Sequence, residues 1–137
     1  MATGILIVSH SEKLAQGLVE LVSEMGNENV IIREAAGTSD GRLGTDAVRI
    51  QEALESDDFK DCKSILIYCD LGSSIISSEM AMDMIDDEAL TGKIHIVDCP
   101  LVEGAFTGVV QASVTDDVDE IIKVSKQARD MHKGDEA

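Results

Sequence analysis

Two polar segments of this chain carry side chains that can do chemistry. Ser9, His10 and Ser11 directly follow the first apolar run, and Asp70 stands at the end of a later one. A helix is predicted to begin just after His10, and the free N–H groups and macrodipole at a helix amino end favour an anion. That end also disfavours imidazolium, so the ring keeps a nucleophilic lone pair near neutral pH. These features predict a phosphoryl group carried on the imidazole of His10.

Asp70 and the two serines are the predicted supporting groups. If Asp70 reaches the other ring nitrogen of His10, its carboxylate fixes the imidazole tautomer and stabilises the positive charge that develops during transfer. The hydroxyls of Ser9 and Ser11 can donate hydrogen bonds to phosphoryl oxygens. The alternatives are structural: His10 is a capping or loop residue, Asp70 is an N-cap, and the serines end a strand and cap a helix.

The remaining histidines and the cysteines favour structural roles. His95 lies inside an apolar run, and His132 lies near the carboxyl terminus. Cys62, Cys69 and Cys99 form no CxxC pair and lack the spacing of metal ligands, which predicts buried, reduced thiols in a cytosolic protein. A reactive thiol at Cys99 is the alternative.

The glycine-rich and acidic segments match no binding motif. Neither GxxxxGK[ST] nor GxGxxG occurs, so we expect no nucleotide or other cofactor on this chain. The loop Gly37–Thr45 is either a flexible connection or a rim that contacts a partner. The acidic groups lack the spacing of a calcium loop, which predicts solvated surface and no metal site; they are Asp57–Asp58, Asp86–Glu88 and Asp116–Asp117.

Short apolar strands alternate with segments of helical period along the chain. The predicted strands are Ile5–Val8, Val30–Ile32, Ser64–Tyr68 and Lys93–Val97. The first two predicted helices run from about Ser11 to Met25 and from an N-cap at Thr45 to Leu54. The third runs from a cap at Ser73 or Ser74 to Met84. The last two run from about Val102 to Ala112, and from a cap among Thr115, Asp116 and Asp117 to about Arg129.

Two helices have apolar patterns that are specific enough to check. The first helix is predicted to stop at Gly26 as its C′ residue, with an apolar face made of Leu14, Leu18, Leu21, Val22 and Met25. The third helix is predicted to have Ile75, Ile76, Met80, Met82 and Met84 along its apolar side.

This alternation predicts an α/β three-layer sandwich, in which helices cover both faces of a mostly parallel four-stranded sheet. Helices on both faces require a reversal of strand order. If the order is 2-1-3-4, the reversal lies between the first and third strands, and ligand chemistry belongs outside the carboxyl ends of those strands. That order would bring His10 and Asp70 into one crevice.

Charge and composition exclude several classes of function. The 137 residues include 11 Lys and Arg against 27 Asp and Glu, so the formal charge is −16. Nucleic acids and anionic membranes demand a basic face, so neither is an expected partner. Aromatic residues make up only 2% of the chain, which disfavours platforms for base stacking and predicts an aliphatic core.

Length and end segments predict one domain, residues 1–133, followed by a frayed tail at 134–137. The first apolar run lacks a preceding basic segment and is too short for a signal peptide or a membrane span. We therefore expect a cytoplasmic protein.

Four motifs in order resemble one known family. They are Gly4–Ser11, Gly44–Val48, Asp70–Ser74 and Pro100–Ala105. Together they are similar to the phosphotransferase subunit of PTS-dependent dihydroxyacetone kinase, and the likeness covers nearly the whole chain. That family's domain is similar in fold to the EIIA domain of the mannose-type sugar phosphotransferase system.

The resemblance implies a phosphoryl relay. In it, His10 receives the phosphoryl group from HPr, which enzyme I has charged from phosphoenolpyruvate. The group then passes to ADP held in the nucleotide-binding kinase subunit, which phosphorylates dihydroxyacetone on a third, dihydroxyacetone-binding subunit. Asp70 matches the carboxylate that supports the histidine in mannose-type relatives, and the resemblance favours Nε2 as the phosphorylated nitrogen. It also implies a homodimer. Some family members carry further HPr-like and enzyme I-like domains, for which 137 residues leave no room.

Three other functions remain open on the sequence. The first is a mannose-type EIIA of a sugar transporter, which shares the chemistry but has a different acceptor. The second is a signalling receiver phosphorylated on Asp70, although a receiver needs an acidic metal site where this chain has Ser9, His10 and Ser11. The third is a non-catalytic binding module of the same fold, which would carry no covalent label.

Overall fold

Four parallel strands form the centre of the computed structural model, which describes residues 1–134. They are β1 (Thr3–Val8), β2 (Val30–Glu34), β3 (Ser64–Cys69) and β4 (Ile94–Val97). Their order in the sheet is β2-β1-β3-β4, which confirms the predicted reversal between β1 and β3. All pairs are parallel.

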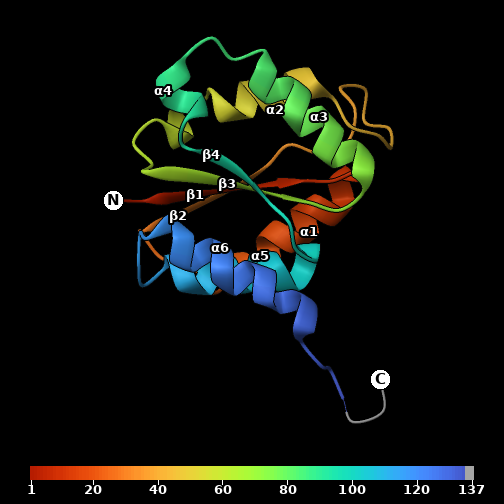
Figure 1. The fold of residues 1–137 in the computed structure, drawn as a ribbon. Helices are drawn as coiled ribbons and strands as arrows, with labels where there is room; N and C mark the ends of the chain where they lie inside the picture. Colours follow the sequence, from red (N-terminus) through yellow and green to blue (C-terminus); the bar gives the residue numbers. More distant parts are fainter. Residues whose placement is uncertain (135–137) are drawn as a thin grey trace.

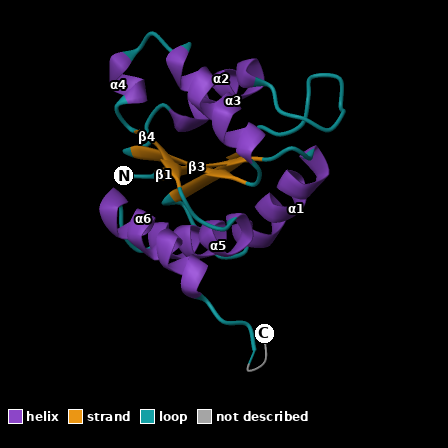
Figure 2. Cartoon of the chain, turned by 45° about the vertical axis from the view of Figure 1, so that its right-hand side comes forward, coloured by secondary structure: helices purple, strands orange, loops and turns teal. Residues whose placement is uncertain are grey.

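Helices cover both faces of this sheet, and the three layers are seen in Figures 1 and 2. One face is covered by α1 (Glu12–Ser23), α5 (Leu101–Ala112) and α6 (Val118–Gln127). The other is covered by α2 (Ala47–Leu54), α3 (Gly72–Asp83) and α4 (Glu88–Thr91). Two 3₁₀ turns, η1 (Asp57–Phe59) and η2 (Ala128–Asp130), complete the elements, and neither α4 nor η1 was expected from the sequence.

The central strands explain why this layered arrangement holds. Every residue of β1 and of β3 is buried, because a strand between two helical layers has no solvent-facing side. Each fully buried Ile or Leu of these strands contributes roughly 1.5–3 kcal/mol relative to an exposed one. The sheet therefore has two cores, one beneath α1, α5 and α6 and one beneath α2 and α3.

Two predicted apolar faces were wrong in part. In α1, Leu18 and Val22 are buried as expected, whereas Leu14, Leu21 and Met25 are 43–49% exposed. In α3, Met82 is half-buried and packs against the core as expected, but the other predicted apolar residues, Ile75, Ile76, Met80 and Met84, are exposed. The helix packs on the sheet mainly through small residues, since Ser74, Ser78 and Ala81 are buried. The buried serines are tolerated because their hydroxyls have polar partners near the ends of β3.

Two predicted helix ends differ from the structure, and the structure selects one of the three candidates for a third. The N-cap of α2 is Asp46, whose carboxylate accepts from the N–H of Val48, and not Thr45. Gly26 is not a left-handed C′ residue, because the positive-φ glycines are Gly37, Gly41 and Gly44, and α1 ends at Ser23. Among the three candidates for α6, Asp117 is the N-cap.

A close approach of α5 to the sheet depends on Gly108. A Cβ atom there would lie 2.2 Å from the hydroxyl oxygen of Tyr68 and 2.8 Å from that of Ser125. Those two hydroxyls are themselves hydrogen-bonded at 2.7 Å inside the core. The glycine therefore lets α5 and α6 close over β3.

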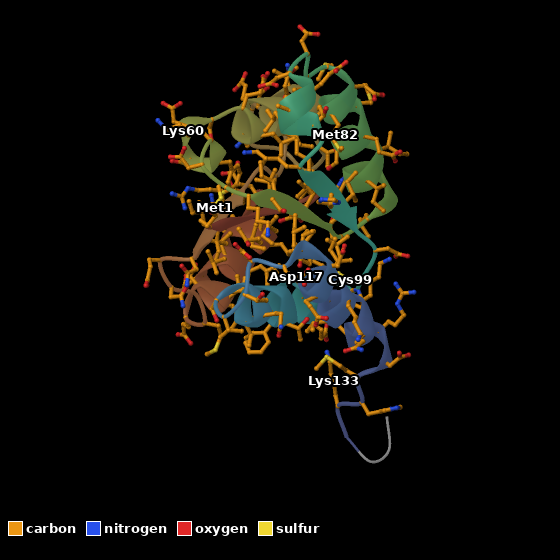
Figure 3. All side chains as sticks on the ribbon, turned by 60° about the vertical axis from the view of Figure 1, so that its left-hand side comes forward. Met1, Lys60, Met82, Cys99, Asp117 and Lys133 are labelled. Atoms are coloured by element: carbon orange, nitrogen blue, oxygen red, sulfur yellow. The ribbon has the colours of Figure 1, made fainter. Side chains whose placement is uncertain are left out.

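The carboxyl-terminal segment leaves the sandwich after η2. Figure 3 labels Lys133 on this segment, and the ammonium group of Lys133 pairs with the carboxylate of Glu103 on α5. The domain boundary at residue 133 stays a prediction. Of the predicted tail at 134–137, all residues after Gly134 lie outside the described residues. Across residues 1–134, no helix has both the length and the apolar character needed to cross a membrane.

Candidate active site

The register of β1 and β3 places the predicted site residues together. Val8 pairs with Cys69, so both strands end at the same level of the sheet. The next residues, Ser9 and His10 on one side and Asp70 on the other, therefore meet at the carboxyl edge. This is the meeting point expected from the strand order.

Asp70 is the centre of a hydrogen-bond network at this edge. Its Oδ2 accepts from the hydroxyl of Ser9 at 2.6 Å and from the backbone N–H of His10 at 3.1 Å. Its Oδ1 accepts from the backbone N–H of Leu71 and from the hydroxyl of Ser74, both at 2.6 Å. The carboxylate thus ties the end of β1 to the beginning of α3.

These bonds keep Asp70 ionised. Partial burial acts to raise the pKa of Asp70, but the hydrogen bonds from Ser74, Ser9, Leu71 and His10 outweigh it and hold the pKa below its ordinary value. A fixed negative charge therefore lies beside His10 at neutral pH.

The imidazole of His10 has one enclosed and unpartnered nitrogen. Its Nδ1 is buried and has no hydrogen-bond partner among residues 1–134, although the residue as a whole is half-buried. Asp70 contacts the main chain of His10, and no hydrogen bond from Asp70 to the ring is present. The sequence predicts a contact between the carboxylate of Asp70 and the imidazole ring, but Asp70 instead fixes the backbone of His10. The carboxylate oxygens already accept four hydrogen bonds, from Ser9, His10, Leu71 and Ser74.

The two serines beside His10 are held in different ways. Ser9 is fully buried, and its hydroxyl donates to Asp70 and accepts from the N–H of Ser11 at 3.0 Å. Its proton is therefore already used. Ser11 is the N-cap of α1, where its hydroxyl oxygen accepts from the N–H of Leu14 at 3.2 Å. The hydroxyl proton of Ser11 is used by no hydrogen bond within residues 1–134.

Two helix amino ends converge on His10. α1 begins two residues after it, and α3 begins two residues after Asp70. In the described part of the chain, no acceptor is bonded to the N–H groups of Glu12 and Lys13 in the first turn of α1. Free N–H groups at a helix amino end stabilise a phosphoryl group.

The glycine-rich loop is hydrogen-bonded to this edge, whereas its contact with a partner stays a prediction. The N–H of Gly44 donates to the carbonyl of His10 at 2.8 Å, and the N–H of Gly37 donates to that of Ser9 at 3.1 Å. The hydroxyl groups of Thr45 and Ser77 are 2.6 Å apart, which joins the end of the loop to α3. The loop is therefore a rim of the site.

The other candidate residues do not join the site. His95 is half-buried in β4, and His132 is exposed after η2. Burial raises the pKa of the Cys69 and Cys99 thiols to about 11, so both are protonated at neutral pH, which disfavours a reactive Cys99. Within residues 1–134, no three His, Cys, Asp or Glu side chains converge as metal ligands.

Sequence reasoning missed one residue of this network. Ser74 was expected only as a helix cap, but it lies inside α3 and donates to Asp70. Its spacing of four residues from Asp70, one helical turn, is the signal that pointed to this contact.

Comparison with known proteins extends these observations. The family model described as "PTS system fructose IIA component" matches residues 4–122. A phosphoryl donor subunit of the PEP-dependent dihydroxyacetone kinase 2 of Listeria innocua is 43% identical over 119 residues, which cover 87% of this chain and 93% of that protein. The corresponding subunit of Providencia stuartii is also 43% identical over 128 residues, but this chain spans only 26% of its length.

Two solved structures share the fold. The protein EF1359, whose function is described as unknown, is 41% identical with a TM-score of 0.82, and the match covers 92% of this chain and 94% of that one. The phosphotransferase system component EIIA of Streptococcus agalactiae is 18% identical with a TM-score of 0.65 and 96% coverage of both chains. The second likeness supports the predicted EIIA-like architecture alone.

Proposed function

Since this chain belongs to the mannose-type EIIA family of the phosphotransferase system and is similar to phosphoryl donor subunits of dihydroxyacetone kinases, we propose that it is a covalent phosphoryl relay. His10 takes the phosphoryl group from phospho-HPr and passes it to ADP in the nucleotide-binding subunit of a dihydroxyacetone kinase. The observation that carries the proposal is the position of His10 at the amino end of α1, beside an ionised Asp70.

Transfer onto this histidine uses the outer nitrogen of the ring. Because Nδ1 is buried, Nε2 is the nitrogen that faces an incoming donor. The Nε2 lone pair attacks phosphorus in line, and the bond from phosphorus to the donor atom breaks with its electron pair leaving on the donor. In the second transfer, a terminal phosphate oxygen of ADP attacks and the electron pair of the phosphorus–nitrogen bond returns to the imidazole. Positioning and charge stabilisation dominate the rate of such transfers.

Local donors must overcome the charge of the whole chain. A phosphoryl group adds about −1.5 to −2 charges, and the chain already has a formal charge of −16. The free N–H groups of Glu12 and Lys13 and the unused proton of Ser11 supply that local stabilisation. Partners that dock here are expected to present basic or apolar surfaces, and their association should weaken with salt.

The relay needs no cofactor of its own, because the nucleotide is bound in the partner subunit. That partner phosphorylates dihydroxyacetone held on the dihydroxyacetone-binding subunit. We place the relay in the cytoplasm. The three cysteines support that location, since all are free thiols and disulfides are rare there.

The acceptor separates this function from its nearest alternative, a mannose-type EIIA of a sugar transporter. Chain phosphorylated with phosphoenolpyruvate, enzyme I and HPr is mixed with the ADP-loaded kinase subunit or with the acceptor protein of a mannose-type transporter. We expect rapid discharge and formation of ATP in the first mixture only. Discharge in the second mixture alone would assign the chain to sugar transport.

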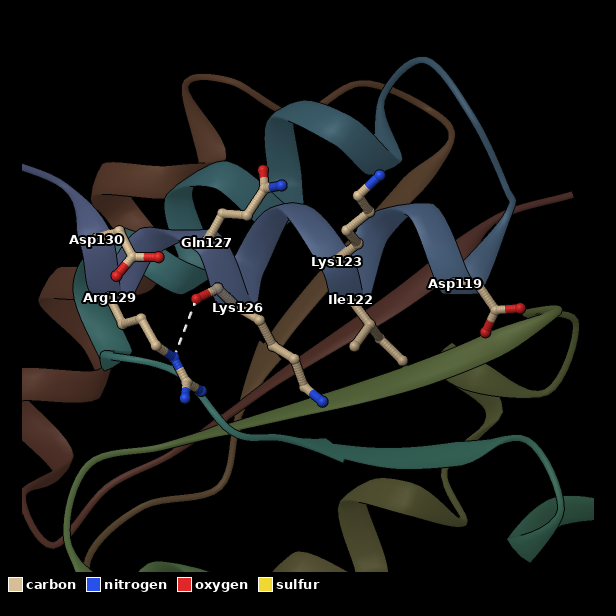
Figure 4. Close-up of a pocket in the computed structure, with 7 residues that line it drawn as sticks. All are labelled: Asp119, Ile122, Lys123, Lys126, Gln127, Arg129 and Asp130. Carbon is tan, nitrogen blue, oxygen red and sulfur yellow. Dashed lines mark hydrogen bonds between the residues drawn. The ribbon is translucent and has the colours of Figure 1, made fainter.

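The homodimer that the family resemblance implies fits the free edge of β4. β4 pairs only with β3, so its other edge lacks a neighbouring strand in the described residues. Beside it lies a groove of about 510 Å³ whose lining includes Asp119, Ile122 and Arg129. Figure 4 shows the side chains of these three residues extending from α6 and η2 toward the strand that runs below them.

Acidic and basic side chains both line this groove: Asp119 and Asp130 accompany Lys123, Lys126 and Arg129, and Arg129 also pairs with Asp98 of the same chain. Asp119 lies at the first turn of α6 and Arg129 lies beyond its last turn, with the apolar Ile122 between them. An isologous contact would set Asp119 of one copy against the partner's Arg129, and the reverse. We therefore propose that two copies associate through the β4 edge and this groove.

A charge-swap experiment tests this interface. Asp119→Lys should weaken dimerisation about tenfold, because it sets like charges together, and adding Arg129→Glu should restore it. Glu120→Lys is the matched control, since it makes the same charge change in the same turn. Dissociation constants from analytical ultracentrifugation decide. A monomeric wild type, or a double variant no tighter than Asp119→Lys, would contradict the interface.

A further inference from the structure

Arg49 on α2 joins the glycine-rich rim to the helix that follows His10. Its Nη1 donates to the carbonyl of Thr38 in the loop at 3.1 Å. Its Nη2 lies 3.5 Å from Oε2 of Glu12, in the first turn of α1. One guanidinium group therefore links α2, the loop and α1.

The same loop is bonded to the main chain of the site. Gly37 donates to the carbonyl of Ser9 and Gly44 donates to the carbonyl of His10, so the two ends of the loop hold the two residues that lead into α1. Gly37 has a φ of 70°, a conformation that favours glycine. Its Cβ position is also crowded, since a Cβ would lie 3.2 Å from the Cβ of Glu12. The loop is packed directly on the first turn of α1.

Arg49 also balances carboxylates that would oppose a phosphoryl group. Glu12 lies two residues after His10. Glu34 lies nearby, and its buried Oε2 has no hydrogen-bond partner in the described part of the chain. Burial and the charge of Glu12 raise the pKa of Glu34, whereas the charge of Arg49 lowers it. The other arginine of this region, Arg42, pairs with Asp40 at the exposed tip of the loop.

We propose that Arg49 is a positioning residue of the phosphoryl relay. Its guanidinium holds the loop 37–44 on the amino end of α1 and neutralises Glu12. His10 and the free N–H groups of the first turn thereby stay aligned with the incoming phosphorus. This inference rests on the proposed function for its catalytic consequence, but its structural part stands on the contacts alone. In-line transfer is sensitive to such alignment, because misplacement of about 1 Å can cost 10²-fold in rate.

Single-turnover phosphorylation by phospho-HPr provides the first test. At saturating donor, Arg49→Gln should transfer about tenfold more slowly than the wild type, with less than a twofold change in the donor concentration at half-maximal rate. Arg49→Lys, which keeps the charge but loses the two-pronged contact, should recover part of the rate. Arg42→Gln is the matched control, and its rate should stay within twofold of the wild type.

A double-mutant cycle separates the electrostatic part. Glu12→Gln removes the carboxylate that Arg49 neutralises and keeps the main-chain N–H, so it should restore part of the rate in the Arg49→Gln background, and the two substitutions together should cost less than the sum of their separate effects. A rate for Arg49→Gln within twofold of the wild type would overturn the inference, and so would a loss of rate confined to donor affinity.

Amide hydrogen exchange measures the positioning directly and without any partner protein. In Arg49→Gln, the amides of Gly37 and Gly44 should exchange at least about tenfold faster, while those of β1 keep wild-type protection. Unchanged protection in the loop, or an equal loss of protection throughout the sheet, would refute the proposal that Arg49 holds the loop on α1. Labelling that persists without His10 would instead refute the relay and leave the exchange result intact.

Discussion

Replacing His10 with alanine is expected to abolish labelling of this chain by phosphoenolpyruvate in the presence of enzyme I and HPr. Among the three histidines, all of which the structure describes, only His10 combines a half-exposed imidazole with the free N–H groups of a helix amino end, because His95 lies within β4 and His132 lies after η2. Removal of the nucleophile leaves no group for the phosphorus to join. Radiolabel or intact mass, followed over time, gives the result.

Two controls sharpen this prediction. His132→Ala removes an exposed imidazole and should label at the wild-type rate. Unfolding of His10→Ala should remain cooperative, since the Nδ1 of that ring has no hydrogen bond to lose. Wild-type labelling of His10→Ala would remove His10 from the proposed role. Hydroxylamine-sensitive label would point to an acyl phosphate and therefore to the receiver alternative.

Asp70→Ala is expected to slow phosphoryl transfer about 10- to 100-fold, because it releases the backbone of His10 from its anchor. The substitution also leaves the buried hydroxyl of Ser9 and the N–H of His10 without their acceptor. Unpaired buried groups cost roughly 1–3 kcal/mol each, so we expect these two to lower the free energy of unfolding by about 2–6 kcal/mol. Rapid-quench kinetics and denaturant titration measure the two effects.

The matched control for Asp70→Ala is Asp87→Ala. Asp87 also accepts backbone N–H groups, as the N-cap of α4, but it lies away from the site. Its loss should cost about 1 kcal/mol and leave the transfer rate unchanged. An unchanged rate in Asp70→Ala would reduce Asp70 to a structural cap.

The stability lost in Asp70→Ala should itself depend on pH. Because the folded-state pKa of Asp70 lies below its ordinary value, its contribution is fully present above about pH 4 and is lost as the pH falls through the folded-state pKa. The difference in unfolding free energy between wild type and variant should therefore shrink in acid. A constant difference would show that the ionised form is not preferentially bound.

The alternation of strands and helices was predictable because the sequences of buried parallel strands are continuous apolar runs. Residues 5–8 and 64–68 are clear strands in the sequence for this reason. The need to cover both faces required a reversal of strand order but did not determine the order 2-1-3-4, which the sequence left as a condition and the structure confirms. The orientation of α3 was not predictable from its apolar residues. Ser74 and Ser78 are buried because Asp70 and Cys69 supply their partners, and those contacts form only when β3 and α3 are in place.

The candidate site was predictable as a set of residues but not as a set of contacts. Position at the ends of β1 and β3 was enough to bring His10 and Asp70 together. The expected bond from Asp70 to the imidazole ring is replaced by bonds to the main chain of His10 and the side chain of Ser9. Arg49 had no signal in the sequence, because its partners come from two distant segments that meet only in the fold.

The apolar residues that α1 and α3 leave exposed lie on helices that begin at the site. Leu14 and Leu71 are 46% and 57% exposed, and each lies within four residues of His10 or Asp70. We expect these side chains to make apolar contacts with a docked partner, and salt does not weaken such contacts. A proposed partner that lacks basic groups would therefore bind with little dependence on ionic strength, and a basic one with a strong dependence.

The most direct measurement observes the phosphorus–nitrogen bond itself. Chain labelled with ¹⁵N in its histidine rings is phosphorylated with phosphoenolpyruvate, enzyme I and HPr, and ³¹P–¹⁵N couplings are recorded before and after addition of the ADP-loaded kinase subunit. We predict a single coupling to Nε2 of His10, which disappears as ATP forms. A coupling to another histidine, or a phosphorylated chain without any phosphorus–nitrogen coupling, would contradict the phosphohistidine relay.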